Sequence, residues 1–227
     1  MATWGVHIRI AEAILKENRF EVDKTSFLVG NIAPDAGMPN ADWSQFTPPP
    51  EISHWKDDDN IINPQLFFDS NLSREIEDRK EWSFLVGYYV HLMTDVEWVG
   101  MIEDTRKVNT DYDKLKTDKN FIWEIKKDWY DLDHKYFRDN PVNIFWTDFQ
   151  YIKEFPNYLD YFSEDAIMSR MNYITEFYNN PSEDLDREYK YLQMKDMNLF
   201  LNKTVRIITD ELNSKLAYFD DNLVSLK

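Results

Sequence analysis

The sequence predicts an all-α fold, a multi-helix bundle in a single domain, and three observations support this prediction. The 227 residues include only 5 glycines and 9 prolines, which leaves few turn signals and favours long helices. Apolar residues recur at three- and four-residue intervals in several stretches, and no stretch shows the alternation of a half-buried strand. A chain of this length can build one good-sized core, so we expect one domain over residues 1–227.

The helices can be located from these intervals and from residues that commonly begin and end helices. Val6, Ile10 and Ile14 form one apolar stripe, which predicts a helix over about residues 3–18. Further helices are predicted over about residues 25–33, 63–78, 81–104, 120–138 and 163–179, and from 182 to near the end of the chain. The proline-rich stretch 38–53 is predicted to be a functional lid or a disordered segment.

The charge of the chain excludes several classes of partner. It has 42 acidic and 26 basic residues, a net charge of −16 and a pI near 4.6. An acidic surface repels nucleic acids and anionic membranes because it lacks the basic patch that polyanions require. We therefore expect no nucleic-acid partner.

The composition also bears on location and on the kind of metal site. The chain has no cysteine, so it has no disulfide and no thiolate ligand. The first residues lack the basic start, apolar run and cleavage site of a signal peptide. No run approaches the roughly 20 apolar residues that span a bilayer. These features predict a cytoplasmic protein without a transmembrane segment.

One apolar helix carries two polar residues that an inert core would not contain. His91 and Asp95 are four residues apart and therefore share a helix face, which Gly87 leaves bare one turn earlier. Because an unpaired buried charge is unfavourable, both side chains need a partner. A metal ion is the partner that we predict.

Three more residues in or beside apolar stretches complete a possible donor set: His7, Asp35 and His54. Zinc binds imidazole nitrogen and carboxylate oxygen where no thiolate is offered. Five ligands exceed one tetrahedral site but suit two metals that share a carboxylate, as in phosphate-ester hydrolysis. Singly, each residue has an ordinary structural role in the core or at a helix end. Spacing alone leaves both interpretations open.

Four short motifs follow one another along the first hundred residues. They are Trp4-x-x-His7, Phe27-Leu28-x-Gly30-x-x-Ala33-Pro34-Asp35, Ser53-His54-Trp55 and Gly87-Tyr88-x-x-His91-Leu92-x-Thr94-Asp95. In this combination the chain resembles the zinc-dependent phospholipase C family, an all-helical fold that the zinc-dependent single-strand nucleases also resemble. The resemblance covers about residues 1–100, the metal-site part of the chain up to about residue 105, and only a helical pattern is recognisable over about 106–227.

The resemblance implies a phosphoesterase that hydrolyses a phosphodiester, from a phospholipid or a small head-group-type substrate, with a metal-activated water. It implies one Zn²⁺ held by Asp35, His54, His91 and Asp95, and a second held by His7 and the bridging Asp95. Asp35 is also the candidate catalytic base. We expect one or two ions, zinc or another divalent metal.

The chain departs from the secreted members of the family at two points. Their N-terminal tryptophan matches Trp4, which is not a terminus here, so only its main-chain carbonyl could bind metal. No histidine follows shortly after Asp95, and the only later one is His134, which is predicted to lie on the surface or in helix packing. The third zinc site is therefore predicted to be absent or rebuilt from carboxylates such as Asp131. These departures leave an alternative, a non-catalytic helical metal-binding or interaction protein.

Aromatic residues in and beside the proline-rich stretch are predicted to contact the substrate. Residues 38–53 would form one wall of the cleft, and Trp43, Phe46 and Trp55 could touch an apolar or cationic part of the substrate. The sequence has no basic amphipathic helix of the kind that binds membrane surfaces. Bulk lipid is therefore a less natural substrate than a small phosphodiester or a zwitterionic head group.

Overall fold

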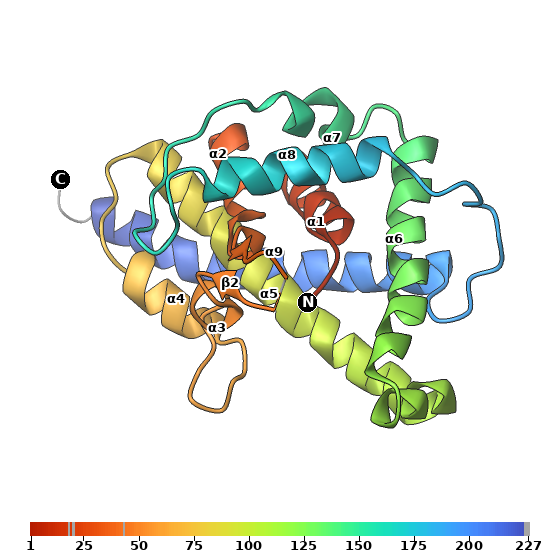
Figure 1. The fold of residues 1–227 in the computed structure, drawn as a ribbon. Helices are drawn as coiled ribbons and strands as arrows, with labels where there is room; N and C mark the ends of the chain where they lie inside the picture. Colours follow the sequence, from red (N-terminus) through yellow and green to blue (C-terminus); the bar gives the residue numbers. More distant parts are fainter. Residues whose placement is uncertain (18, 20, 43, 225–227) are drawn as a thin grey trace.

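A computed structural model describes the backbone of residues 1–17, 19, 21–42 and 44–224, and side chains as far as residue 216. Within these residues the regular secondary structure is helical except for one pair of two-residue strands, which confirms the all-α prediction (Figure 1). The α-helices are α1 (Trp4–Glu17), α2 (Lys24–Gly30), α3 (Pro50–Ser53), α4 (Pro64–Asn71), α5 (Arg79–Val108), α6 (Ile122–Asp139), α7 (Ile144–Thr147), α8 (Ala166–Asn179) and α9 (Met194–Val224). Short 3₁₀ helices are η1 (Ala33–Asp35), η2 (Thr110–Lys116), η3 (Lys119–Phe121) and η4 (Phe149–Tyr151).

Helix α1 packs against five other helices: α2, α5, α6, α7 and α9. Its Val6 and Ile10 are fully buried, as the predicted apolar stripe requires. In Figure 1 the long helix α5 crosses the molecule diagonally, α8 crosses above the N-terminus and α6 descends beside it. The N-terminus therefore lies among these helices and not at the periphery of this view.

Helices α2 and α5 touch through their backbones at two glycines. A Cβ atom on Gly87 would lie 2.2 Å from the carbonyl oxygen of Phe27, and one on Gly30 would lie 1.9 Å from that of Phe84. Distances this short are forbidden to real side chains, so only glycine permits the crossing. This contact between α2 and α5 explains why the helix face that carries His91 has no side chain at Gly87.

The proline-rich stretch forms a short hairpin and a helix. Strands β1 (Met38–Pro39) and β2 (Phe46–Thr47) pair antiparallel, with Met38 opposite Thr47. The peptide bond between Thr47 and Pro48 is cis. Helix α3 follows and leads directly into His54. The segment thus connects the region of η1 to a histidine of the predicted donor set.

Two predicted helix boundaries are wrong, and side-chain hydrogen bonds explain both. Helix α4 begins at the predicted Asn63 cap but ends at Asn71. The hydroxyl of Ser73 donates to the carbonyl of Asp69, and the backbone amide of Ser73 donates to that of Phe68 instead, so the helical pattern does not continue. The last helix begins at Met194 and not near Ser182. Residues in the intervening segment bind α6 instead, through Ser182 to Asp131 and through Arg187 to the same carboxylate.

Replacing Gly87 with alanine is expected to lower the free energy of unfolding by about 3 kcal/mol, because the new methyl group would overlap a backbone carbonyl. Gly100 lies on the same helix, and a Cβ atom there would have no described atom within 4 Å, so Gly100→Ala is the matched control. That control should stabilise the protein by about 0.5–1 kcal/mol. Urea denaturation measures both values, and equal effects would contradict the proposed helix contact.

Candidate metal centre and adjoining pocket

The five predicted donors come from four places in the chain and meet around one carboxylate. His7 lies on α1, Asp35 ends η1, His54 follows α3, and His91 and Asp95 lie on α5. Their donor atoms form two groups, and within each group the atoms lie within 4.8 Å of one another. One group is His7, Asp35 and His91, and the other is His54, His91 and Asp95. The helix packing thus brings together residues that are up to 88 positions apart, from 7 to 95.

Three histidine nitrogens approach the two oxygens of Asp95 from different sides. The Nε2 atom of His7 lies 3.5 Å from Oδ1, whereas the Nε2 atoms of His91 and His54 lie 3.5 and 3.6 Å from Oδ2. His54 Nε2 also lies 3.4 Å from Oδ1 of Asp35. Asp95 therefore has one oxygen toward His7 and the other toward the remaining histidines, which suits a carboxylate that bridges two ions.

The spacing of these atoms suits a cation better than hydrogen bonds. The Nε2 atoms of all three histidines and Oδ2 of Asp95 are buried without a hydrogen-bond partner in the described residues. Buried polar atoms are seldom left without a hydrogen-bond partner. The distances of 3.4–3.6 Å between these atoms are also longer than the roughly 2.9 Å between the heavy atoms of a hydrogen bond. Two ligands of a tetrahedral zinc ion, each about 2.1 Å from it, lie about 3.4 Å apart. The donor set and its spacing therefore fit zinc.

Neighbouring backbone groups orient two members of the set. His91 donates its Nδ1–H to the carbonyl oxygen of Asn31 at 2.9 Å, which leaves the lone pair of Nε2 directed at the cluster. The side-chain amide of Asn31 donates to the carbonyl of His7 at 2.6 Å, so one residue ties α1 and α5 together. The backbone amide of Ala2 donates to Oδ1 of Asp95 at 2.6 Å.

Burial and neighbouring charges keep three of the donors, Asp35, Asp95 and His7, in the forms that bind metal. Burial would raise the pKa of Asp35, but the contact with His54 and the nearby histidines lower it to about 2. The pKa of Asp95 is likewise held well below its usual range by His7 and His91, against the effect of burial. Burial and the neighbouring His91 lower the pKa of His7 to about 4. At neutral pH both carboxylates are ionised and His7 is unprotonated.

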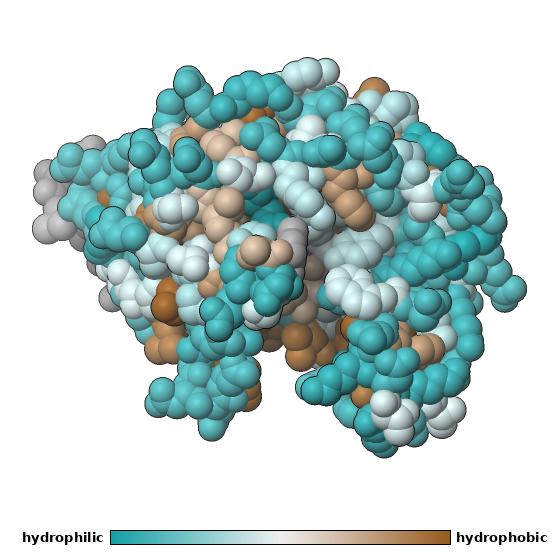
Figure 2. All heavy atoms as spheres, in the orientation of Figure 1, coloured by the Kyte–Doolittle hydropathy of each residue, from teal (hydrophilic) through white to brown (hydrophobic). Residues whose placement is uncertain are grey.

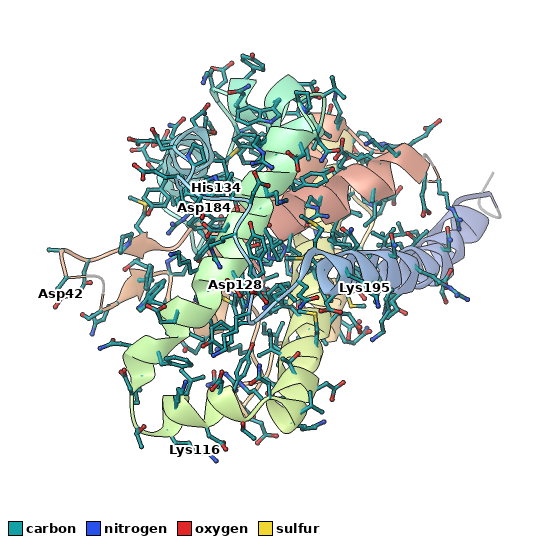
Figure 3. All side chains as sticks on the ribbon, turned by 90° about the vertical axis from the view of Figure 1, so that its right-hand side faces the viewer. Asp42, Lys116, Asp128, His134, Asp184 and Lys195 are labelled. Atoms are coloured by element: carbon teal, nitrogen blue, oxygen red, sulfur yellow. The ribbon has the colours of Figure 1, made fainter. Side chains whose placement is uncertain are left out.

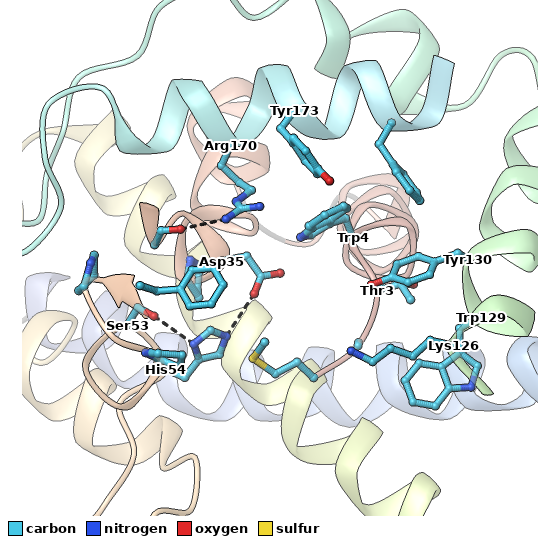
Figure 4. Close-up of a pocket in the computed structure, with 18 of the residues that line it drawn as sticks. Thr3, Trp4, Asp35, Ser53, His54, Lys126, Trp129, Tyr130, Arg170 and Tyr173 are labelled. Atoms are coloured by element: carbon cyan, nitrogen blue, oxygen red, sulfur yellow. Dashed lines mark hydrogen bonds and ion pairs between the residues drawn. The ribbon is translucent and has the colours of Figure 1, made fainter. Parts of the chain in front are cut away.

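A pocket of about 350 Å³ opens onto this centre, with Asp35 and His54 among its lining residues (Figure 4). Its walls come from the N-terminal residues, the proline-rich segment, α6 and α8. The lining is rich in aromatic side chains: Trp4, Phe46, Trp123, Trp129, Tyr130, Tyr173 and Phe177. Residues 38–53 contribute Phe46, Pro48, Pro50 and Ser53, so this segment forms part of the wall as predicted.

The predicted substrate-contacting aromatics have different positions. Phe46 lines the pocket, whereas Trp55 is not among the lining residues. The indole nitrogen of Trp55 donates to the hydroxyl of Tyr161, and its ring meets that of Phe67 edge-on. Trp43 lies outside the described residues. The side chain of Trp4 lines the pocket and meets the ring of Tyr173 edge-on.

The residues considered for a third metal are engaged elsewhere on α6, the helix that faces the viewer in Figure 3. Asp131 accepts hydrogen bonds from Ser182 on one oxygen and from Arg187 on the other. His134 packs against Phe177 and Tyr178, with ring centroids 4.9 and 5.2 Å away. Neither residue belongs to the possible metal-binding groups of the described chain.

Four further residues shape this region although the sequence did not single them out. Asn31 and Ala2 bind the donors through a side chain and a backbone amide, and nothing in their identity signals either role. Lys126 and Arg170 line the pocket from α6 and α8, in the part of the chain where only a helical pattern was recognised. An isolated basic residue on an amphipathic helix is typical of a solvated side chain, so no signal distinguishes them.

Comparison with known proteins identifies the segment that carries the centre. Residues 6–98 match the family described as zinc dependent phospholipase C, which confirms the resemblance. All five predicted donors fall inside this segment. The comparisons with curated proteins and with solved structures found no match. No helix in the described residues is long and apolar enough to cross a membrane, and the face in Figure 2 is largely hydrophilic.

Zinc affinity should fall as the pH drops from 8 to 5. Burial would lower the pKa of His91, but Asp95 and Asp35 raise it above the ordinary 6.5. Protons and metal compete for the same lone pair, so binding weakens once His91 takes up a proton, by up to about tenfold per pH unit. Competition with a chromophoric chelator measures this affinity. Affinity that stays constant down to about pH 4 would contradict histidine ligation.

Proposed function

We propose that this chain, which belongs to the zinc-dependent phospholipase C family through residues 6–98, is a metal-dependent phosphoesterase that hydrolyses a phosphodiester. The observation that carries the proposal is the group of buried, unpartnered donor atoms beside a pocket large enough for a small ligand. A structural metal would need the donors but not the pocket. The combination therefore favours hydrolysis over a purely structural role.

The donors divide naturally around Asp95. In the proposal Asp35, His54, His91 and Asp95 hold one divalent cation, with His54 and His91 on the Oδ2 side of Asp95. His7, on the Oδ1 side, holds a second cation together with Asp95. His91 has one free ring nitrogen, so it can serve only one ion although it belongs to both groups. In the proposal His91 serves the first ion, and Asp95 is the ligand that both ions share.

Bound cations would supply positive charge that lowers the pKa of a water molecule and neutralises the phosphoryl oxygens. Asp35 and His54 are the two members of the donor set that line the pocket, so a phosphodiester would reach the centre beside them. With a pKa of about 2, Asp35 is ionised at neutral pH and can accept a hydrogen bond from the attacking water. The aromatic walls would exclude part of the solvent from the reacting groups.

His91→Ala and Asp95→Asn should each abolish metal binding and reduce phosphodiester hydrolysis by at least about 100-fold, because each removes a ligand. Elemental analysis gives metal per chain, and a panel of phosphodiesters gives activity. His134→Ala is the control, since it removes a histidine that packs against Phe177 and Tyr178. The control should keep its metal, and unchanged activity in His91→Ala would show that the site lies elsewhere.

Removing the metal should lower the stability of the fold and also abolish the activity of the protein. A ligand present at about 1,000 times its dissociation constant adds about 4 kcal/mol to the free energy of unfolding. Treatment with a chelator should therefore lower the melting temperature by several degrees, and added zinc should restore it. The proposed function would be contradicted if the purified protein contained almost no metal and its melting temperature did not change with chelator or with zinc.

A further inference from the structure

The pocket carries a charge opposite to that of the chain. Acidic residues outnumber basic residues by 42 to 26 in the whole sequence. Among the described side chains that line the pocket, the only carboxylate is Asp35, which belongs to the candidate metal centre. Lys126 and Arg170 line it from α6 and α8. With cations bound at the centre, the whole pocket would be positive.

Arg170 is fixed in place with hydrogen-bonding capacity left over. The residue is only 8% exposed, and Nη2 donates to the carbonyl oxygen of Gly37 at 2.9 Å. Its guanidinium carbon lies 5.6 Å from the ring centroids of both Trp4 and Tyr173. The Nε–H is buried without a hydrogen-bond partner in the described residues. A buried donor without a partner is unfavourable, so it indicates a missing acceptor.

Lys126 is the second cation, and Figure 4 shows its side chain extending into the pocket beside Trp129. No hydrogen bond or ion pair joins it to the described residues, and its ammonium lies 5.2 Å from the ring centroid of Trp123. Burial lowers the pKa of Lys126, and the negative charge of Asp35 only partly opposes this shift. Its ammonium group therefore lies within electrostatic reach of the candidate centre.

The aromatic walls do not form a cage for a ligand ammonium group. Such cages use ring faces that are free to receive a cation. Here Arg170 lies over Trp4 and Tyr173, and Lys126 lies over Trp123. A quaternary ammonium group would meet two like charges at the rings that should attract it. The pocket thus disfavours the zwitterionic head group considered from the sequence.

We infer that the pocket selects phosphodiesters with a second anionic group, a carboxylate or another phosphate, which Lys126 and Arg170 bind. This inference rests on the proposed function, in which the candidate centre holds the reacting phosphate. A lipid head group and a soluble phosphodiester share this chemistry. Arginine suits the second group because its planar donors match two oxygens of a carboxylate or phosphate.

Two ligands of nearly equal size test the selection directly. 2-Phosphoglycolate and phosphocholine both carry a phosphate on a short carbon chain, which ends in a carboxylate or in a trimethylammonium group. Titration calorimetry with the zinc-loaded protein should show phosphoglycolate binding at least about tenfold more tightly. Inorganic phosphate serves as the reference for binding at the centre alone.

Variants of the two cations identify the cause of the preference. Lys126→Gln and Arg170→Gln should each reduce the preference for phosphoglycolate by about tenfold, and their binding of inorganic phosphate should change less. Lys127→Gln is the matched control, because Lys127 is exposed on the same helix and does not line the pocket. Arg170 is buried, so Lys126→Gln decides the question if the other variant does not fold.

Hydrolysis of a lipid pair and of a soluble pair then shows whether the preferred substrate is a lipid or a soluble phosphodiester. Dioctanoyl phosphatidylinositol is compared with its 4-phosphate, and the deacylated glycerophosphoinositol with its 4-phosphate. Faster hydrolysis of the phosphorylated member in either pair supports the inference, and the faster pair identifies a lipid or a soluble substrate. Faster hydrolysis of the unphosphorylated member in both pairs would overturn it.

Failure of this inference differs from failure of the proposed function. If zinc and inorganic phosphate bind but phosphocholine binds as tightly as phosphoglycolate, the inference is overturned and the phosphoesterase proposal stands. The same holds if Lys126→Gln leaves the ratio of the two affinities unchanged. A protein that binds no zinc overturns the proposed function and this inference with it.

Discussion

A completely buried carboxylate organises the N-terminal half of this protein. Asp95 has no exposed surface, yet the nearby histidines keep it ionised, and an uncompensated charge at such a depth would destabilise the fold severely. Three histidines from three segments face it, with the amide of Ala2 as its hydrogen-bond donor. The positions of α1, α3 and α5 are thus coupled to one charge, and a bound cation would neutralise it.

The backbone contact between α2 and α5 makes this arrangement possible. At Gly30 and Gly87 the helices approach more closely than any side chain allows. That approach puts Asn31 beside His91 and lets one residue orient a ring on α5 while it binds the backbone of α1. Two glycines therefore act on the chemistry of the centre although neither contributes an atom to it.

The sequence predicts the fold and the donor set where the signal is local. The interval of four between His91 and Asp95 and the apolar stripe of α1 follow from helix geometry alone. Tertiary contacts explain the predictions that are wrong and the residues that the sequence did not single out. The helix expected near Ser182 begins at Met194, because Arg187 and its neighbours bind α6 instead of one another. Lys126 and Arg170 lie at the same pocket only because α6 and α8 both line it, and no spacing in the sequence predicts this.

The central claim is that these buried donors hold metal, and diffraction from a crystal at the zinc absorption edge tests it most directly. We expect an anomalous peak enclosed by the side chains of Asp35, His54, His91 and Asp95, with a second peak between Asp95 and His7 if two ions bind. The absence of any peak from crystals grown with zinc, or a peak confined to other residues, would contradict it.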